Sequence, residues 1–202
     1  MTKIKICGLS RPQDIDYVNE AQPDWCGFII NFPKSHRNVT PDQVRALRAG
    51  LDPAICPVGV FVNQPVEEIA ALLRDGTLAV AQLHGQEGPE DIAALRALVP
   101  GCQIWKAFQI RSAADLEAAL ASPADLVLLD NGQGTGQTFD WSLVTGVSRP
   151  FLLAGGLTPD NIPQAIQAVH PYGLDLSSGV ETDKVKDREK ILAAVAAARK
   201  IP

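Results

Sequence analysis

Two residues that could transfer protons each end a short apolar segment. Cys7 ends segment 4–7 and precedes Gly8, which would leave room for a ligand, and Asp130 ends segment 126–130. Cys7 is either a small buried hydrophobic residue or a reactive group at the mouth that Lys5 biases toward thiolate. Asp130 either caps the next loop or acts as a general acid, because burial favours its protonated form. We take Cys7 and Asp130 as the candidate catalytic residues.

Two glycine turns follow two later segments. Gly155 and Gly156 come after segment 151–154, and Ser178 and Gly179 come after segment 173–176. Glycine lets backbone N–H groups approach a phosphate closely, although tight turns also require glycine. Neither turn contains Lys or Arg, so we expect backbone amides and dipoles to hold a phosphate there.

One cation and one imidazole complete the candidate binding residues. Arg37 lies in a polar stretch after segment 25–30, where it either binds a carboxylate or stacks on a ring, or is a solvated loop cation. His84 follows segment 78–83 and either contacts a ligand or is a hydrogen-bonded structural residue. His170 precedes a segment rather than following one, which indicates a structural role.

These residues must be positioned by alternating strands and helices. Apolar segments recur every 20 to 30 residues, and most gaps between them have helical periodicity. Helix starts are expected at Ser10-Arg11-Pro12, Thr40-Pro41, Gly88-Pro89 and Thr158-Pro159, because an N-cap followed by proline is typical of a first turn. The eight predicted strands are segments 4–7, 25–30, 55–62, 78–83, 103–108, 126–130, 151–154 and 173–176.

Eight strands alternating with about eight helices favour a closed (β/α)₈ barrel, an α/β fold of the TIM-barrel type, over an open doubly wound sheet. In a barrel, the active site lies at the carboxyl ends of the strands, where the candidate residues are found. If Cys7 points into the barrel, Lys5 does too, because side chains alternate along a strand. The chain has no linker or low-complexity tract, so residues 1–202 are expected to form one domain with short loops.

The composition excludes several other classes of protein. The 202 residues are 46% hydrophobic and 20% charged with a net charge of -5, which argues against nucleic-acid and anionic-membrane surfaces. Four separated cysteines and three scattered histidines suggest neither disulfides nor a metal site. We find no signal peptide and no span of about 18 apolar residues, so we expect a cytoplasmic protein.

A set of short motifs follows the strand ends in order along nearly the whole chain. These motifs are segments 5–8, 27–29, 58–63, 82–85, 134–136, 139–141, 153–157 and 177–181, with Ser35, Arg37, Lys186 and Asp187. Taken in this order, they resemble the phosphoribosylanthranilate isomerase family. Three places depart from the family's usual pattern: His36, the loop 132–136, and residues 182–184 before Lys186.

The resemblance implies an intramolecular oxidoreductase of tryptophan biosynthesis that converts an aldose into a ketose. Its reaction is the Amadori rearrangement of N-(5-phosphoribosyl)anthranilate to 1-(2-carboxyphenylamino)-1-deoxyribulose 5-phosphate, without a cofactor. Asp130 matches the general acid and Cys7 the general base. The glycine turns would bind the phosphate, and Arg37 would bind the anthranilate.

Other readings remain open from the residues alone. Another phosphosugar barrel would commonly need a metal cluster or a Schiff-base lysine at a strand end, whereas Lys106 lies within its strand and Lys5 lies below Cys7. A catalytically silent barrel would only bind a phosphorylated metabolite. The presence of both Cys7 and Asp130 argues against this reading, because such a barrel would not need them. The sequence leaves monomer and homodimer open, as well as acceptance of a second ribosyl substrate.

Overall fold

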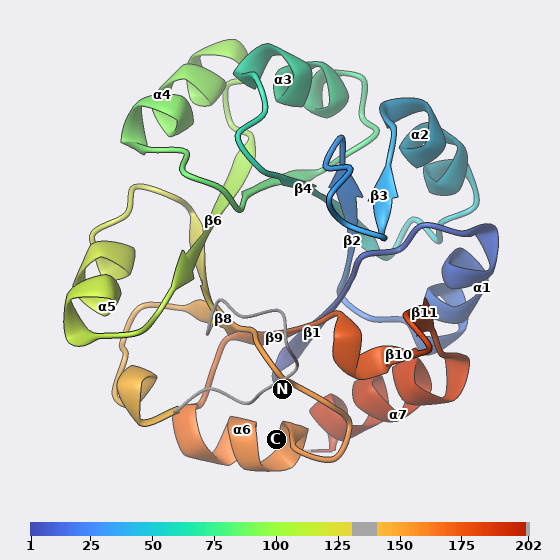
Figure 1. Ribbon diagram of the computed structural model, residues 1–202, viewed down its shortest axis with the longest axis vertical. Helices are drawn as coiled ribbons and strands as arrows, with labels where there is room; N and C mark the ends of the chain where they lie inside the picture. Colours follow the sequence, from blue (N-terminus) through green and yellow to red (C-terminus); the bar gives the residue numbers. More distant parts are fainter. Residues whose placement is uncertain (131–140, 201–202) are drawn as a thin grey trace.

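Parallel strands form a closed ring in the computed structural model, which describes residues 1–130 and 141–200 (Figure 1). The pairing order β1-β9-β8-β7-β6-β5-β4-β2 closes because β1 also pairs with β2. The fold is therefore a (β/α)₈ TIM barrel, and the predicted class is confirmed. The barrel strands are β1 (Lys3–Cys7), β2 (Trp25–Ile30), β4 (Cys56–Phe61), β5 (Val80–Leu83), β6 (Gln103–Gln109), β7 (Leu126–Asp130), β8 (Phe151–Leu153) and β9 (Gly173–Leu176).

Helices surround this barrel on its outer side (Figure 1). Seven α-helices lie in the described residues, and the described part of the β7–β8 connection contains the 3₁₀ turn η1 (Trp141–Val144). The predicted glycine loop 132–136 lies outside the described residues. The helices are α1 (Pro12–Ala21), α2 (Pro41–Ala49), α3 (Val66–Arg74), α4 (Pro89–Leu98), α5 (Ala113–Leu120), α6 (Ile162–Val169) and α7 (Arg188–Arg199).

Three of the four predicted helix starts are confirmed, with proline as the first helical residue of α1, α2 and α4. The predicted start at Thr158 is wrong, because α6 begins at Ile162. The Oδ1 atom of Asn161 accepts a hydrogen bond from the Thr158 N–H, and its Nδ2 donates to the Gly156 carbonyl. The polar turn 158–161 thus supports the preceding glycine turn instead of opening a helix.

Alternation along the strands separates two apolar cores. Ile4 and Ile6 belong to the larger core between strands and helices. Lys5 points into the barrel and is fully buried, as predicted. The inner core consists of Trp25, Val58, Val80, Trp105, Leu126, Leu128, Leu152 and Ala154. The barrel is therefore a packed support for the residues at its carboxyl end.

Two small additions to the barrel are not predicted from the sequence. The two-residue strand β3 (Asn38–Val39) pairs with the end of β2. An antiparallel hairpin follows β9 and the 3₁₀ turn η2 (Ser178–Val180), and consists of β10 (Glu181–Thr182) and β11 (Val185–Lys186). Both additions lie beyond the carboxyl ends of barrel strands, and the hairpin residue Glu181 forms an ion pair with Arg37.

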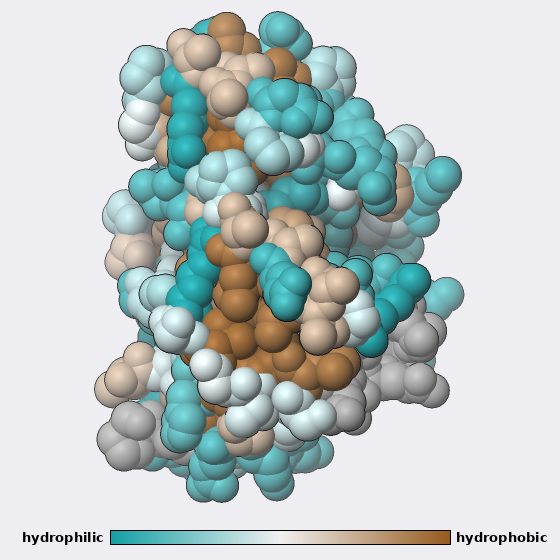
Figure 2. Space-filling model, turned by 90° about the vertical axis from the view of Figure 1, so that its left-hand side faces the viewer, coloured by the Kyte–Doolittle hydropathy of each residue, from teal (hydrophilic) through white to brown (hydrophobic). Residues whose placement is uncertain are grey.

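The outer surface mixes hydrophilic and apolar areas. Figure 2 shows the side that carries α4 and α5, where apolar residues gather in one area. Only Ala119 of α5 is buried, and Leu120 at its end has 36% of its surface exposed. Within the described residues, none of the helices combines the length and the apolar character needed to cross a membrane.

Candidate active site

A pocket of about 350 Å³ opens at the carboxyl ends of the barrel strands. All eight candidate site residues line this pocket: Cys7, Arg37, His84, Asp130, Gly155, Gly156, Ser178 and Gly179. Apolar side chains from β2 and β4 (Ile29 and Val60) form part of its wall. Residues spread over 172 positions of the chain therefore converge because the barrel closes.

Cys7 lies beside a buried ion pair. The Lys5 ammonium donates to Asp175 Oδ1 at 2.9 Å, and the two residues are register partners in the pairing of β1 with β9. A Cβ atom on Gly27 would lie 2.8 Å from Cys7 Sγ and 3.0 Å from Lys5 Nζ. The glycine of β2 thus leaves the space in which the thiol and the ammonium meet.

Burial and charge act on the Cys7 thiol in opposite directions. Burial raises the pKa of Cys7, the Lys5 ammonium opposes this rise, and the Asp175 carboxylate adds to it. Burial alone would lower the pKa of Lys5, but Asp175 and Cys7 outweigh it and keep that pKa above its usual value. Lys5 therefore remains a cation beside Cys7, but it does not overcome the burial of the thiol.

Gly8 serves a different purpose from the one predicted. Its φ is +82°, and a Cβ atom there would lie only 2.4 Å from Cδ of Arg37. The space beside the catalytic candidate is therefore filled by the Arg37 side chain and is not left for a ligand. Arg37 itself is not a free loop cation, because it forms a two-point ion pair with Glu181 at the pocket edge.

His84 and Asp130 line the same two pockets. Burial lowers the pKa of His84, and the Asp130 carboxylate partly opposes that shift. The Gln82 amide lies 2.9 Å from His84 Nδ1, which leaves Nε2 as the ring nitrogen available to a ligand. His84 is therefore a neutral imidazole held in one orientation at the pocket.

The two glycine turns pack directly against each other. Gly155 and Gly156 have φ of +89° and +66°, which L-residues with side chains rarely adopt. A Cβ atom on Gly179 would lie 1.8 Å from the Leu157 carbonyl oxygen. The turns therefore form one surface, with η2 beginning at Ser178 as the short helix start that favours an anion.

The sequence did not indicate the cation behind these turns. Lys186, on β11, is almost fully buried and donates to the Ser177 carbonyl at 2.9 Å and to Glu181 Oε1 at 2.6 Å. Burial lowers the pKa of Lys186, and Glu181 opposes that shift. The expectation that the phosphate site depends on amides alone thus overlooked Lys186, whose only signal was its place in the resemblance.

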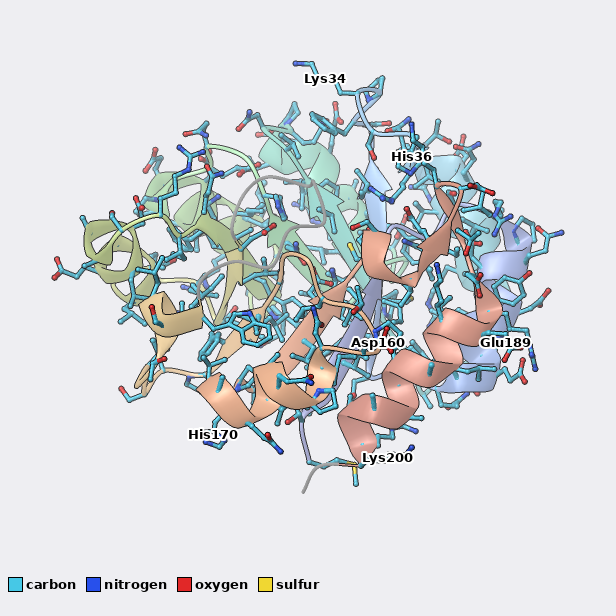
Figure 3. The ribbon with its side chains drawn as sticks, turned by 60° about the horizontal axis from the view of Figure 1, so that its bottom comes forward. Lys34, His36, Asp160, His170, Glu189 and Lys200 are labelled. Carbon is cyan, nitrogen blue, oxygen red and sulfur yellow. The ribbon has the colours of Figure 1, made fainter. Side chains whose placement is uncertain are left out.

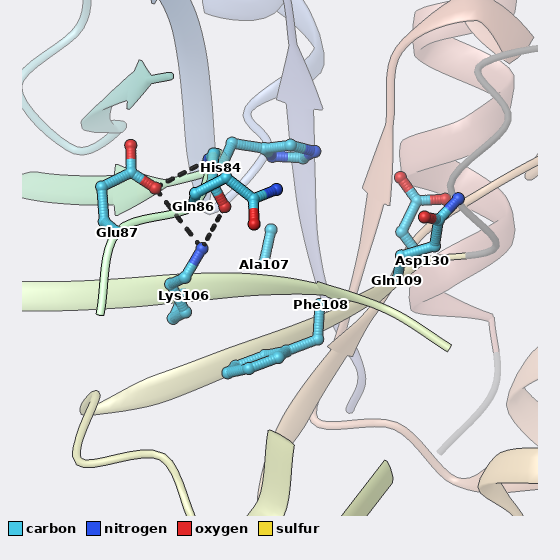
Figure 4. A pocket seen from close by; sticks show the side chains of 9 residues that line it. His84, Gln86, Glu87, Lys106, Ala107, Phe108, Gln109 and Asp130 are labelled. Atoms are coloured by element: carbon cyan, nitrogen blue, oxygen red, sulfur yellow. Dashed lines mark hydrogen bonds and ion pairs between the residues drawn. The ribbon is translucent and has the colours of Figure 1, made fainter. Parts of the chain in front are cut away.

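A second pocket of about 430 Å³ adjoins the first over β5 and β6 (Figure 4). It shares His84 and Asp130 with the main pocket. Lys106 closes one end by donating to the Gly85 carbonyl at 2.8 Å and pairing with Glu87 at 3.4 Å. Lys106 is thus engaged in structural contacts rather than being free to attack a carbonyl.

The histidines do not cluster. Figure 3 shows His36 and Lys34 at one end of the molecule and His170 at the other. His170 ends α6 in the left-handed conformation and is exposed, in agreement with a structural role. In residues 1–130 and 141–200, no group of three or more His, Cys, Asp or Glu residues is arranged to hold a metal ion.

Comparison with known proteins decides among the barrel families. Residues 4–197 match the model of the N-(5'-phosphoribosyl)anthranilate (PRA) isomerase family. The chain belongs to the PRA isomerase family. A PRA isomerase from Acetivibrio thermocellus is 42% identical over 204 residues, an alignment that covers 95% of this chain and 93% of the relative.

Solved PRA isomerases have the same fold over the full length of both chains. Monomers of the dimeric enzyme from Thermotoga maritima match with a TM-score of 0.86 at 34% identity. A PRA isomerase in complex with reduced 1-(o-carboxyphenylamino)-1-deoxyribulose 5-phosphate matches with a TM-score of 0.86 at 33% identity. The chain is thus an isomerase of N-(5'-phosphoribosyl)anthranilate (EC 5.3.1.24) in tryptophan biosynthesis, and the predicted activity is confirmed.

Proposed function

We propose that Cys7 is the general base and Asp130 the general acid of the isomerisation. The observation that carries this proposal is that both residues line the pocket that also contains the glycine turns and Arg37. Positioned acids and bases each contribute about 10²- to 10⁴-fold to a rate. A thiol at the end of β1 and a carboxylic acid at the end of β7, both lining one pocket, can divide the two proton transfers between them.

The reaction begins with protonation of the ribose ring oxygen. Protonated Asp130 donates this proton as the C1–O bond breaks, and the anthranilate nitrogen supplies the electron pair that forms an iminium at C1. The iminium acidifies the C2–H bond, and the Cys7 thiolate removes that proton to form an enolamine. Protonation of C1 and loss of the C2 hydroxyl proton then give the ketone, so electrons move only within the substrate.

The remaining candidates bind the two anionic ends of the substrate. The phosphate is held by backbone N–H groups of Gly155, Gly156, Ser178 and Gly179, because the paired turns have no side chain in the way. Arg37 binds the anthranilate carboxylate, and His84 contacts the substrate between these ends. Since every step is a proton transfer or an internal electron shift, the reaction requires no metal, nicotinamide or flavin.

The single barrel domain, for which we propose the bounds 1–202, is expected to act as a monomer or a homodimer. The Thermotoga maritima relative is described as dimeric. Each barrel contains its own Cys7 and Asp130, so we expect the same activity per chain in either state. Sedimentation velocity distinguishes the two states by mass.

The proposal is tested by growth without tryptophan of a strain that lacks its PRA isomerase. We expect the wild-type gene to restore growth and the Cys7→Ala and Asp130→Asn genes to fail at equal protein level. Growth supported by either variant as fast as by the wild type would contradict its assigned role. Failure of the wild-type gene, despite soluble expression, would contradict the function itself.

A further inference from the structure

The Arg37 guanidinium has two hydrogen-bonding edges, and among residues 1–130 and 141–200 only the edge formed by Nε and Nη2 is paired, with Glu181. Its Nε donates to Glu181 Oε1 at 2.5 Å and its Nη2 donates to Oε2 at 2.6 Å. A guanidinium has five donors in a planar fork, so the edge formed by Nη1 and Nη2 remains for a second planar carboxylate. Arg37 has 19% of its side chain exposed and lines the main pocket, which places the side chain within reach of a ligand.

Glu181 is itself held firmly. Its side chain is 6% exposed and also accepts from Lys186 at 2.6 Å, while His36 Nε2 lies 3.7 Å from Oε2. Burial alone would raise the pKa of Glu181, but the hydrogen bonds from Arg37 and the charge of Lys186 lower it to about 2. The carboxylate is therefore ionised throughout the neutral range and holds Arg37 at its Nε edge.

The other end of the arginine is restrained as well. Its Cδ is only 2.4 Å from the position that a Cβ atom on Gly8 would take, so the stem packs against the backbone that follows Cys7. Both the stem and the Nε edge are thus in contact with protein. Rotation of the guanidinium plane would break two hydrogen bonds to Glu181.

We infer that Glu181 is a positioning residue that orients Arg37 to recognise the carboxylate on the aromatic ring, and that it thereby sets the preference for a carboxylated arylamine. This inference rests on the proposed role of Arg37 in binding that carboxylate. Lys186 assists Glu181, because its hydrogen bond to Glu181 offsets part of the carboxylate's charge and leaves more of the charge of Arg37 for the ligand. Glu181 is shared between the Arg37 guanidinium and the Lys186 amine, so the positive charge of Arg37 is only partly offset, which suits an anionic ring substituent.

The test compares two ligands that differ only in the ring carboxylate. They are reduced 1-(o-carboxyphenylamino)-1-deoxyribulose 5-phosphate and the same compound with an unsubstituted phenyl ring, each titrated calorimetrically into wild type and Glu181→Gln. We expect the wild type to prefer the carboxylated ligand by at least about tenfold, and Glu181→Gln to reduce this ratio by about tenfold. The affinity for the phenyl ligand should change by less than about threefold.

The phenyl ligand also shows whether the variant retains a folded pocket. Arg37→Lys provides a second variant, because lysine keeps the charge but lacks two edges, and the preference should fall there too. The matched control is Glu20→Gln, which removes a similar two-point pair with Arg188 on the surface and should leave both affinities unchanged.

An unchanged preference in Glu181→Gln would overturn the inference, and so would an equal loss of affinity for both ligands, which marks a merely structural role. Neither result would affect the proposed roles of Cys7 and Asp130, which the growth test of their own variants decides. Absence of wild-type turnover would instead contradict the proposed function.

Discussion

At the scale of single residues, the reactivity of Cys7 depends on three neighbours with opposing effects. Burial and the Asp175 carboxylate favour the thiol, whereas Lys5, and more weakly Lys186, favour the thiolate. An ammonium that is fully buried and permanently charged can act on sulfur without being titrated in the working range. The ion pair therefore tunes the base without taking a proton itself.

Exchanging either member of the ion pair should move the Cys7 pKa in opposite directions. Lys5→Met removes the stabilising cation, so we expect the pKa to rise and thiolate alkylation to require higher pH. Asp175→Asn removes the destabilising anion while its amide oxygen still accepts from Lys5, so the pKa should fall. The pH dependence of iodoacetamide modification, followed by mass spectrometry of the Cys7 peptide, measures both shifts.

Lys3→Met is the control for these two variants. Lys3 lies on the same strand but contacts the rings of Trp25 and Tyr172, at 5.0 Å and 5.4 Å, near the opposite end of the barrel. Its removal should leave the Cys7 pKa unchanged. Shifts of the same sign in Lys5→Met and Asp175→Asn would contradict this description of the charge balance.

The sequence predicted individual residues best where strand alternation or strand ends applied. The inward direction of Lys5 followed from alternation, and the pocket positions of Cys7 and Asp130 followed from the strand ends. Asp175 was missed although it interrupts the apolar β9, because its partner Lys5 is 170 residues away and only barrel closure brings them together. Glu181 was quoted in the motif without a role, because its effect depends on three side chains from two loops.

At the scale of elements, the β10–β11 hairpin controls how the pocket edge is built. Glu181 and Lys186 are register partners across the hairpin, and Thr182 pairs with Val185. The two residues between them, Asp183 and Lys184, have φ of +51° and +64°. Two consecutive residues with positive φ are typical of a type I′ turn, for which Asp-Gly is a favoured pair and Asp-Lys is not.

We expect Lys184→Gly to stabilise the protein. An L-residue with a side chain pays about 1–2 kcal/mol in the left-handed region, and glycine loses part of this gain through its greater freedom when unfolded. The net increase in the free energy of unfolding should be about 0.5–1 kcal/mol. Urea unfolding followed by circular dichroism measures it.

Lys34→Gly is the matched control, because Lys34 is also an exposed loop lysine but does not have positive φ. Glycine there only adds freedom to the unfolded chain, so the free energy of unfolding should stay the same or fall. An equal gain in both variants would show that loss of a surface charge, rather than turn geometry, is responsible.

Helix starts illustrate which local signals suffice. The Thr40 start was predictable because Thr40 and Gln43 bond each other's backbone within one turn. The Thr158 start had the same N-cap and proline signature and was wrong, because Asn161 instead bonds back to Gly156. A local signature therefore fails where the same residues are needed to shape a functional loop.

At the scale of the whole molecule, the barrel separates stability from chemistry. The amino-terminal ends of the strands contain Trp25 and Trp105, packed edge to face with ring centroids 5.2 Å apart. The carboxyl ends contain the pocket with Cys7 and Asp130. Alternating strands and helices were enough to predict this architecture, since a parallel strand must be followed by a crossover that covers it.

The same architecture places the proposed acid and base within one pocket, although β1 and β7 are far apart in the sequence. It also supplies matched controls for each. Cys26 is a buried cysteine that faces the helices, and Asp125 lies at the other end of β7, where it accepts from the Ile104 N–H. Replacing Cys26 or Asp125 therefore removes the same kind of side chain, a thiol or a carboxylate, at a position outside the pocket.

The most direct test is therefore the turnover number of purified Cys7→Ala and Asp130→Asn, beside Cys26→Ala and Asp125→Asn, for N-(5'-phosphoribosyl)anthranilate. We expect each pocket variant to lose at least about a hundredfold in kcat while remaining folded, and each control to stay within about threefold of wild type. Near-normal kcat in folded Cys7→Ala or Asp130→Asn would contradict the assignment of the proton transfers to these residues.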